Sequence, residues 1–176
     1  MNQPSISIRF GLSETTLGLM LVAASVRGVC AIFLGGDSEY LVQALHKRFP
    51  KAEISPAATD DVGFAQLLDA VAQLAEHPET SLEHPLDIHG TTFQQRVWQA
   101  LCEIAPGKTA SYTEIARRIG APRAVRAVAG ACAANPLAIV IPCHRVVHAD
   151  GSLSGYHWGV ERKRALLEKE AVRKTA

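Results

Sequence analysis

The chain opens with alternating and continuous apolar stretches. Residues 6–10 (ISIRF) alternate strictly between apolar and polar side chains, and the stretches LGLMLVAAS (17–25) and GVCAIFLG (28–35) are rich in residues that favour strands. The break at VRG between them is typical of a turn. These patterns predict a meander of three short strands, and hence a small antiparallel sheet.

Helical periodicity follows these strands. One helix is expected over residues 38–49, ended by Pro50. A second helix carries five apolar residues at helical spacing after the capping candidates Thr59 and Asp60. The first half of the chain is therefore expected to fold as an α/β unit.

The segment EHPETSLEHPLDIHG, residues 76–90, is rich in Pro and His and has no periodicity. Such a segment is typical of a connection between folded units. We place a boundary there, which divides the chain into an N-terminal α/β domain, 1–85, and a C-terminal domain, 86–176, expected to be all-α.

Short helices in succession are predicted for the second half. Thr91 with Gln94, and Ser111 with Glu114, have the spacing of a capping box, in which each residue bonds the backbone of the other. Pro122 suits the first turn of a third helix. The last two of these helices are separated by a few residues, which predicts a helix-turn-helix.

The third of these helices has an unusually bare outer surface. Its inward stripe, at i, i+3, i+4 and i+7, consists of Val125, Val128, Ala129 and Cys132. Its opposite face consists of Arg123, Ala127, Gly130 and Ala134, with Arg126 at the flank. Small side chains there fit either tight packing against another helix or close approach to a nucleic-acid groove with arginines inserted. This feature alone leaves both explanations open.

Composition and length limit the class of protein. A chain of 176 residues, 48% of them hydrophobic, with nearly balanced charges can bury a substantial core. Its longest apolar stretch, PLAIVIPC at 136–143, is too short to span a bilayer, and the N-terminus lacks a signal-peptide pattern. We expect a cytoplasmic protein that does not bind membranes.

Charge is distributed unevenly along the chain, although the net charge is only +1. Residues 1–85 carry 5 Lys and Arg against 10 Asp and Glu, which gives −5. Residues 86–176 carry 13 against 7, which gives +6. This asymmetry favours a polyanion as the partner of the C-terminal half.

The four cysteines are too widely spaced for a disulfide scaffold or a zinc-binding pair, so reduced thiols and no metal site are expected. Cys30, Cys102 and Cys132 fall in apolar patterns and are expected to be small core residues. Cys143 differs, because it follows a buried, strand-like run and is followed directly by His144.

A carboxylate on the last predicted helix, VERKRALLEKE, is the natural partner of that histidine. Glu170 shares a helix face with Leu166 and Leu167, and a carboxylate on an apolar face requires a partner. A thiol, an imidazole and a carboxylate in series are the parts of an activated sulfur nucleophile. We therefore expect Cys143, His144 and Glu170 to act together.

Three segments, NPLAIVIPCHRVV, SYTEIARRIGAPRAVRAV and SGYHWGVERKRALLEKE, strongly resemble the O6-alkylguanine-DNA alkyltransferases, also called methylated-DNA-protein-cysteine methyltransferases. The resemblance runs from about Leu17 to Glu170 and is strongest to the C-terminal, alkyl-accepting half of the Ada-type members. It implies an RNase H-like N-terminal domain and a winged-helix-like C-terminal domain that contains the helix-turn-helix.

The same resemblance implies direct-reversal DNA repair. A methyl or small alkyl group would pass irreversibly from O6-alkylguanine, and from O4-alkylthymine, in flipped-out DNA to a cysteine, so each molecule acts once. The implied partner is double-stranded DNA, bound through the minor groove with little sequence preference by a monomer. No cofactor and no metal are implied.

Roles for individual residues follow from the resemblance by position. Cys143 matches the alkyl acceptor, His144 its base through a bridging water, and Glu170 the residue that orients this histidine. Asn135 matches the residue that braces the turn before the active site. Tyr112 matches the residue that rotates the 3′ phosphate and hydrogen-bonds the base.

The resemblance also assigns the DNA contacts and the substrate pocket. Arg126 matches the finger that replaces the extruded nucleotide, and the other expected DNA contacts are Tyr112, Ser111, Arg123, Ala127 and Gly130. The pocket for the alkyl group is expected to be lined by Tyr156, Trp158, Ala138 and Val146. A large indole at Trp158 is expected to narrow that pocket, so that O6-benzylguanine reacts poorly.

Two other functions compete with this one. A winged-helix DNA-binding regulator without chemistry would explain the helix-turn-helix and the basic half, but it leaves the Cys-His-Glu arrangement unused. A cysteine hydrolase or redox enzyme would use that arrangement with turnover, but it gives the bare helix face no role.

Overall fold

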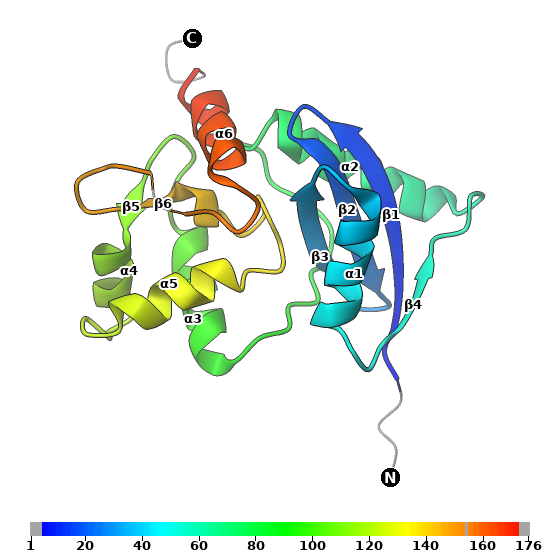
Figure 1. The fold of residues 1–176 in the computed structure, drawn as a ribbon, viewed down its shortest axis with the longest axis horizontal. Coiled ribbons are helices and arrows are strands. Elements are labelled where there is room, and N and C mark those ends of the chain that lie inside the picture. The colour runs from blue at the N-terminus through cyan, green and yellow to red at the C-terminus, as the bar shows by residue number, and fades with distance from the viewer. Residues whose placement is uncertain (1–4, 154, 173–176) are drawn as a thin grey trace.

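The computed structural model describes residues 5–153 and 155–172, which form an α/β fold with a small sheet and a mainly helical part beside it (Figure 1). The elements in chain order are β1 (Ser7–Thr15), β2 (Gly18–Ser25), β3 (Gly28–Gly35), α1 (Ser38–Arg48), β4 (Glu53–Pro56), α2 (Val62–Glu76), α3 (Thr92–Cys102), β5 (Ala110–Ser111), α4 (Tyr112–Arg118), α5 (Val125–Ala133), the 3₁₀ turn η1 (Cys143–Arg145), β6 (Val146–Val147) and α6 (Val160–Val172).

The sheet has the order β3-β2-β1-β4. The predicted meander of β1, β2 and β3 is confirmed, and both of its pairings are antiparallel. The prediction of a wholly antiparallel sheet is wrong, however, because β4 pairs with β1 in parallel. The chain crosses over through α1 between β3 and β4, and a crossover of this kind brings a strand back in the same direction.

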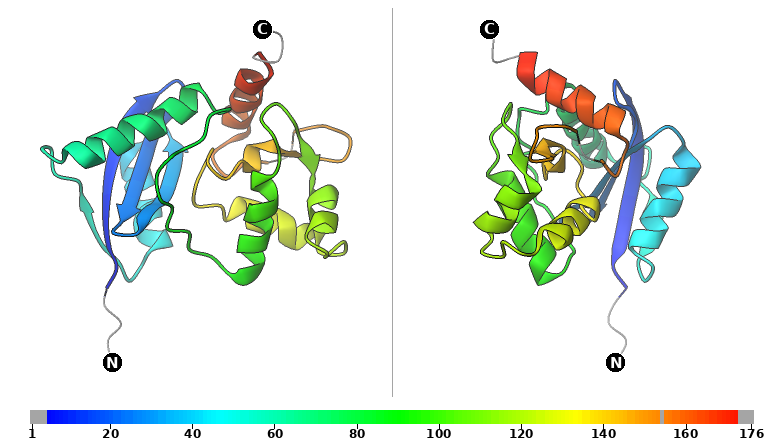
Figure 2. Two further views of the ribbon diagram at one scale, coloured as in Figure 1. Left: turned by 180° about the vertical axis from the view of Figure 1, so that it is seen from behind. Right: turned by 60° about the vertical axis from the view of Figure 1, so that its left-hand side comes forward.

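Helices α1 and α2 cover opposite faces of the sheet (Figures 1 and 2). Each begins at an aspartate whose side chain accepts from a backbone N–H three residues on, Asp37 from Tyr40 and Asp61 from Phe64. The prediction of Thr59 or Asp60 as the second cap is therefore wrong by one or two residues. Asp61 is the N-cap because it directly precedes the first helical residue.

The mainly helical part is built on local signals that the sequence shows. Both predicted capping boxes, Thr91 with Gln94 and Ser111 with Glu114, are present. Helix α5 starts only at Val125, so Pro122 lies in the preceding turn and not in the first helical turn. The prediction of an all-α second half is also wrong, because β5 and β6 form a short parallel pair.

The outer edge of β3 connects the two parts of the molecule. Val29 exchanges backbone hydrogen bonds with the 85–87 segment, and Ile32 does so with residues 136–138. Gly28 permits the first approach, since its φ is +144° and a Cβ there would lie 2.2 Å from the Pro85 carbonyl oxygen. The loop that leads to Cys143 is thus tied to the sheet.

Buried apolar side chains of both parts form one continuous core. The division into two domains at residue 85 therefore stays a prediction. Within the described part of the chain, no helix is both long and apolar enough to cross a membrane.

Candidate functional site

Cys143 lies in the 3₁₀ turn η1, directly after a buried loop. This loop was expected to be strand-like, but it forms only the bridge of Leu137 with Ile32. Its backbone then turns through Ile139, which has a positive φ of 71°, a costly conformation for a β-branched residue. The loop is held in this shape by surrounding contacts, which fix where the thiol points.

Asn135 supplies the main side-chain contacts of this loop. Its Nδ2 donates to the Ile141 carbonyl oxygen at 2.7 Å and to the Cys143 sulfur at 3.1 Å, and its Oδ1 accepts from Leu137 N–H at 2.9 Å. The side chain is only 4% exposed. Asn135 therefore contacts both the backbone of this loop and the thiol itself.

His144 and Glu170 are in direct contact, as their predicted pairing requires. His144 Nε2 lies 2.9 Å from Glu170 Oε1, and both side chains are buried. Burial lowers the pKa of His144, against the opposing effect of Glu170, and this favours the neutral imidazole. Because a carboxylate only accepts, Nε2 carries the proton and Nδ1 is left as the acceptor nitrogen. His144 Nδ1 has no hydrogen-bond partner among the described residues.

Arg145 completes this charged cluster, and sequence reasoning missed it. Its guanidinium donates to both oxygens of Glu170, at 2.7 to 3.1 Å, and to the carbonyl oxygens of Ile104 and Pro78. Although burial raises the pKa of Glu170, hydrogen bonds from His144 and Arg145 lower it to about 2. The only signal in the sequence was an arginine directly after Cys-His, which reads equally well as a surface charge.

Lys163 is a second cation near the thiol that sequence reasoning missed. It is fully buried on α6, and its Nζ donates to the carbonyl oxygens of Val146 and Gly155. Burial lowers its pKa, while the thiols of Cys143 and Cys132 oppose that shift. Its position three residues before Leu166 and seven before Glu170 was the available signal, since all three share a helix face.

Burial favours the protonated form of the Cys143 thiol. Burial raises its pKa, and the Asn135 hydrogen bond and the Lys163 charge offset this only in part. Burial also raises the pKa of Cys30 and Cys132 to about 12, whereas Cys102 is exposed, contrary to the expectation of a core position. A base is thus required before the Cys143 sulfur can attack.

Cys143 lines a cavity of about 590 Å³ that borders α5 from Val125 to Ala133. The cavity is shared by residues from α4, α5 and the segment before α6, namely Tyr112, Val125, Arg126, Ala129, Cys132, Ala133, His148, Gly155, Tyr156 and His157. The Tyr156 hydroxyl is buried without a hydrogen-bond partner among the described residues. A polar group in the cavity could therefore bond to it.

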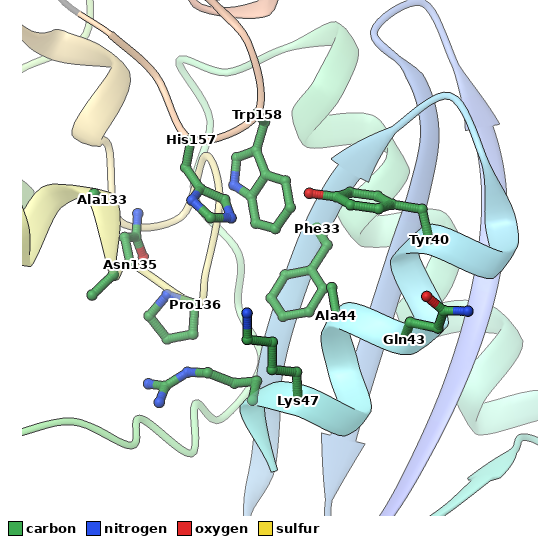
Figure 3. A pocket seen from close by; sticks show the side chains of 12 residues that line it. Phe33, Tyr40, Gln43, Ala44, Lys47, Ala133, Asn135, Pro136, His157 and Trp158 are labelled. Carbon is green, nitrogen blue, oxygen red and sulfur yellow. The ribbon is translucent and has the colours of Figure 1, made fainter. Parts of the chain in front are cut away.

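Three of the four predicted pocket residues do not line this cavity. Trp158 stacks on Phe33 of β3, with ring centroids 4.9 Å apart, and borders a neighbouring cavity instead (Figure 3). Ala138 is held against β3 by a backbone bond to Ile32, and Val146 is buried in the β5–β6 pair. The indole thus packs on the apolar surface of β3, and whether it limits the size of the alkyl group stays a prediction.

The expected DNA-contact residues are mostly accessible. Arg123, Arg126, Ala127 and Gly130 are exposed, and a Cβ at Gly130 would meet no atom within 4 Å. The outer face of α5 is thus not covered by another helix of the described chain. Ser111 is buried, and its hydroxyl accepts from Glu114 N–H as the cap of α4.

The sequence is similar to a family of DNA methyltransferases and to several of its curated members. A family model described as "6-O-methylguanine DNA methyltransferase, DNA binding domain" matches residues 92–172. The "Bifunctional transcriptional activator/DNA repair enzyme Ada" of Escherichia coli K12 is 53% identical over 167 residues, 95% of this chain and 46% of that protein. The inducible methylated-DNA–protein-cysteine methyltransferase of Bacillus subtilis 168 is 40% identical over 152 residues, 85% of this chain and 82% of that protein. The chain therefore spans about half the length of the Ada relatives that it matches.

Solved structures of methyltransferases also resemble this chain in fold. The Mycobacterium tuberculosis O6-methylguanine methyltransferase matches with a TM-score of 0.74 and 36% identity, covering 94% of each chain. A structure of the Mycobacterium tuberculosis protein in complex with DNA matches with a TM-score of 0.73 and 38% identity, covering 96% of this chain and 94% of that one.

Proposed function

Because this chain belongs to the O6-methylguanine-DNA methyltransferase family, we propose that it repairs DNA by taking an alkyl group from O6-alkylguanine onto Cys143. O4-alkylthymine is proposed as a second substrate. The product is a thioether, which water does not hydrolyse under physiological conditions, so each molecule reacts once.

The observation that carries this proposal is the shared cavity. Cys143 is only 5% exposed, yet its sulfur borders a cavity that also touches Arg126 and Tyr112 at the bare face of α5. An alkyl group on guanine O6 lies inside a stacked duplex, so the nucleotide must leave the stack before a sulfur can reach it. A recessed thiol beside an exposed helix face fits a flipped-out base.

His144 is proposed as the base that activates the thiol. Its Nδ1 is the acceptor nitrogen, and it would take the thiol proton through a bridging water. Glu170 fixes the tautomer, and Arg145 keeps that carboxylate ionised. The sulfur then forms a bond to the alkyl carbon as the bond from carbon to O6 breaks.

The departing guanine carries the negative charge after this step. Tyr112 lines the cavity and is proposed to donate a proton to the ring, which makes the base a better leaving group. Asn135 is proposed to aim the thiol at the alkyl carbon. Arg126 is proposed to enter the duplex and occupy the space of the extruded nucleotide.

The partner is proposed to be double-stranded DNA, bound by a monomer through its minor groove with little sequence preference. Arg123, Ala127 and Gly130 would lie against the groove, and Ser111 contributes by capping α4. For the fold, we propose an RNase H-like N-terminal domain and a winged-helix-like C-terminal domain, with the boundary at residue 85.

Intact-mass measurement tests the proposal. After incubation with duplex DNA containing O6-methylguanine, the protein should gain the mass of one methylene group, and peptide mapping should place it on Cys143. Cys143→Ala should bind this DNA without any mass gain. Tight binding of the wild type without a mass gain would favour a non-catalytic DNA-binding protein instead, and a modified Cys102 would overturn the assignment of the acceptor.

A further inference from the structure

A second cavity, of about 450 Å³, lies between α1 and the C-terminal end of α5 (Figure 3). Its aromatic and basic lining residues are Phe33, Tyr40, Trp158, His157, Lys47 and Arg48, and the remaining lining residues are small or uncharged. None of its described lining residues is acidic. An anionic group with a flat or extended shape would fit these walls better than a cation.

This second cavity is continuous with the proposed DNA-binding face. Ala133 and His157 line both it and the Cys143 cavity, and Ala134 follows the last residue of α5. The bare face of α5 therefore ends at the mouth of the second cavity.

Lys47 is the lining residue that is available to such a partner. Its side chain is exposed and forms no hydrogen bond or ion pair with any described residue, and Figure 3 shows it leaving α1 toward Pro136. The neighbouring Arg48 is already engaged, since it donates to the His89 carbonyl oxygen and lies over the Phe49 ring.

The position of Lys47 in the sequence is also unusual. Residues 1–85 contain 5 Lys and Arg, of which Lys47, Arg48 and Lys51 lie within five positions. The surrounding half is acidic, and two residues of this short basic run, Lys47 and Arg48, line the cavity that α1 shares with the end of α5. Lys47 also stands in the last turn of α1, where a cation balances the helix dipole, but that role does not require it to face the cavity.

We propose that Lys47 contacts a backbone phosphate of the bound duplex, so that the N-terminal half takes part in DNA binding. This inference rests on the proposed function and deepens it. The nine residues of α5 span about 13 Å at 1.5 Å per residue. With a phosphate about every 3.4 Å along each strand, a helix of this length laid along the duplex axis would cover roughly four base pairs, so the proposed Lys47 contact lies several base pairs from the flipped nucleotide in that orientation.

Salt dependence of DNA binding gives the first test. One lost phosphate contact lowers the slope of log K against log salt by about 0.9. Lys47→Ala should lower the slope by that amount, so its loss of affinity should be about three-fold larger at 50 mM than at 200 mM salt. The matched control is Lys51→Ala, an exposed lysine of the same basic run that borders a different cavity. Equal slopes for the two variants would overturn the proposal.

Duplex length gives the second test. Duplexes with O6-methylguanine two base pairs from one end or the other remove the distant phosphates on one side at a time. Lys47→Ala should slow methyl transfer from a long symmetric duplex and from one of the two shortened ones, but not from the other. Equal slowing on all three would overturn the proposal. Thermal unfolding of both variants, expected to match the wild type, shows that the fold is retained.

These tests separate the two proposals. If the wild type gains no methyl group from any duplex, the proposed function fails. If the wild type is methylated and Lys47→Ala behaves like Lys51→Ala, only the contribution of the N-terminal half fails.

Discussion

Replacing Glu170 by glutamine tests the buried charge cluster beside Cys143. The carboxylate is fully buried and accepts hydrogen bonds from His144, from Arg145 and from the Gly107 backbone N–H. An amide of the same shape keeps one accepting oxygen and carries no charge. The guanidinium of Arg145 would then remain buried without a counter-charge.

The expected loss of stability follows from that unpaired charge. Removing one partner of a buried ion pair costs about 3–5 kcal/mol. In a protein of this size each kcal/mol lowers the unfolding temperature by about 2–4 °C, so Glu170→Gln should unfold roughly 6–20 °C below the wild type. Glu168→Gln, an exposed carboxylate on the same helix, should unfold within a few degrees of the wild type.

The pH dependence of this difference gives a second signature. Folding lowers the pKa of Glu170 from 4.5 to about 2. A carboxylate with a lowered pKa in the folded state stabilises the fold above its unfolded-state pKa, and this contribution is lost as the pH falls through its folded-state pKa. The gap in unfolding free energy between wild type and Glu170→Gln should thus be full at pH 7 and shrink between pH 4.5 and about 2.

Urea unfolding followed by circular dichroism, at a series of pH values, measures this gap. Single-turnover methyl transfer below the unfolding temperature measures the chemistry separately, and a base with lost orientation should slow it by about 10²–10⁴-fold. An unfolding free energy for Glu170→Gln within about 1 kcal/mol of the wild type at pH 7 would refute the assignment of a buried, charge-bearing pair.

Two further predictions concern the cavity walls. Arg126→Ala should slow methyl transfer from duplex DNA by tenfold or more, because extruding a base costs a few kcal/mol. The same variant should slow transfer from the free modified base far less. Equal losses of rate on both substrates in single-turnover assays would exclude the proposed insertion of Arg126 into the duplex. Trp158→Ala should lower the free energy of unfolding by about 3–5 kcal/mol, because it removes the stack on Phe33, while its rate with O6-benzylguanine relative to O6-methylguanine stays that of the wild type. A large rise in the relative rate with O6-benzylguanine would show that the indole does reach the Cys143 cavity.

Features encoded within a few residues of one another could be read from the sequence. The capping boxes Thr91–Gln94 and Ser111–Glu114 close through bonds between residues three apart, so their geometry depends on the helix itself. The three-strand meander follows from alternation and a short turn. Glu170 was predictable as a partner of His144, because a carboxylate on the apolar face of a helix is buried and needs a hydrogen-bond donor or a cation beside it.

Features that depend on distant segments were decided by the tertiary structure. Arg145 is buried because the carbonyl oxygens of Pro78 and Ile104, 67 and 41 positions away, and the Glu170 carboxylate converge on it. Trp158 turns from the Cys143 cavity because Phe33 lies beside it. A local sequence pattern does not predict which distant backbone carbonyl or aromatic ring will contact a given side chain. These neighbours are fixed only when the edge of the sheet packs against the helical part. The contact between His144 and Glu170 beside Cys143 could thus be predicted from local patterns, whereas the packing of the two parts decided which cations and cavity walls surround these residues.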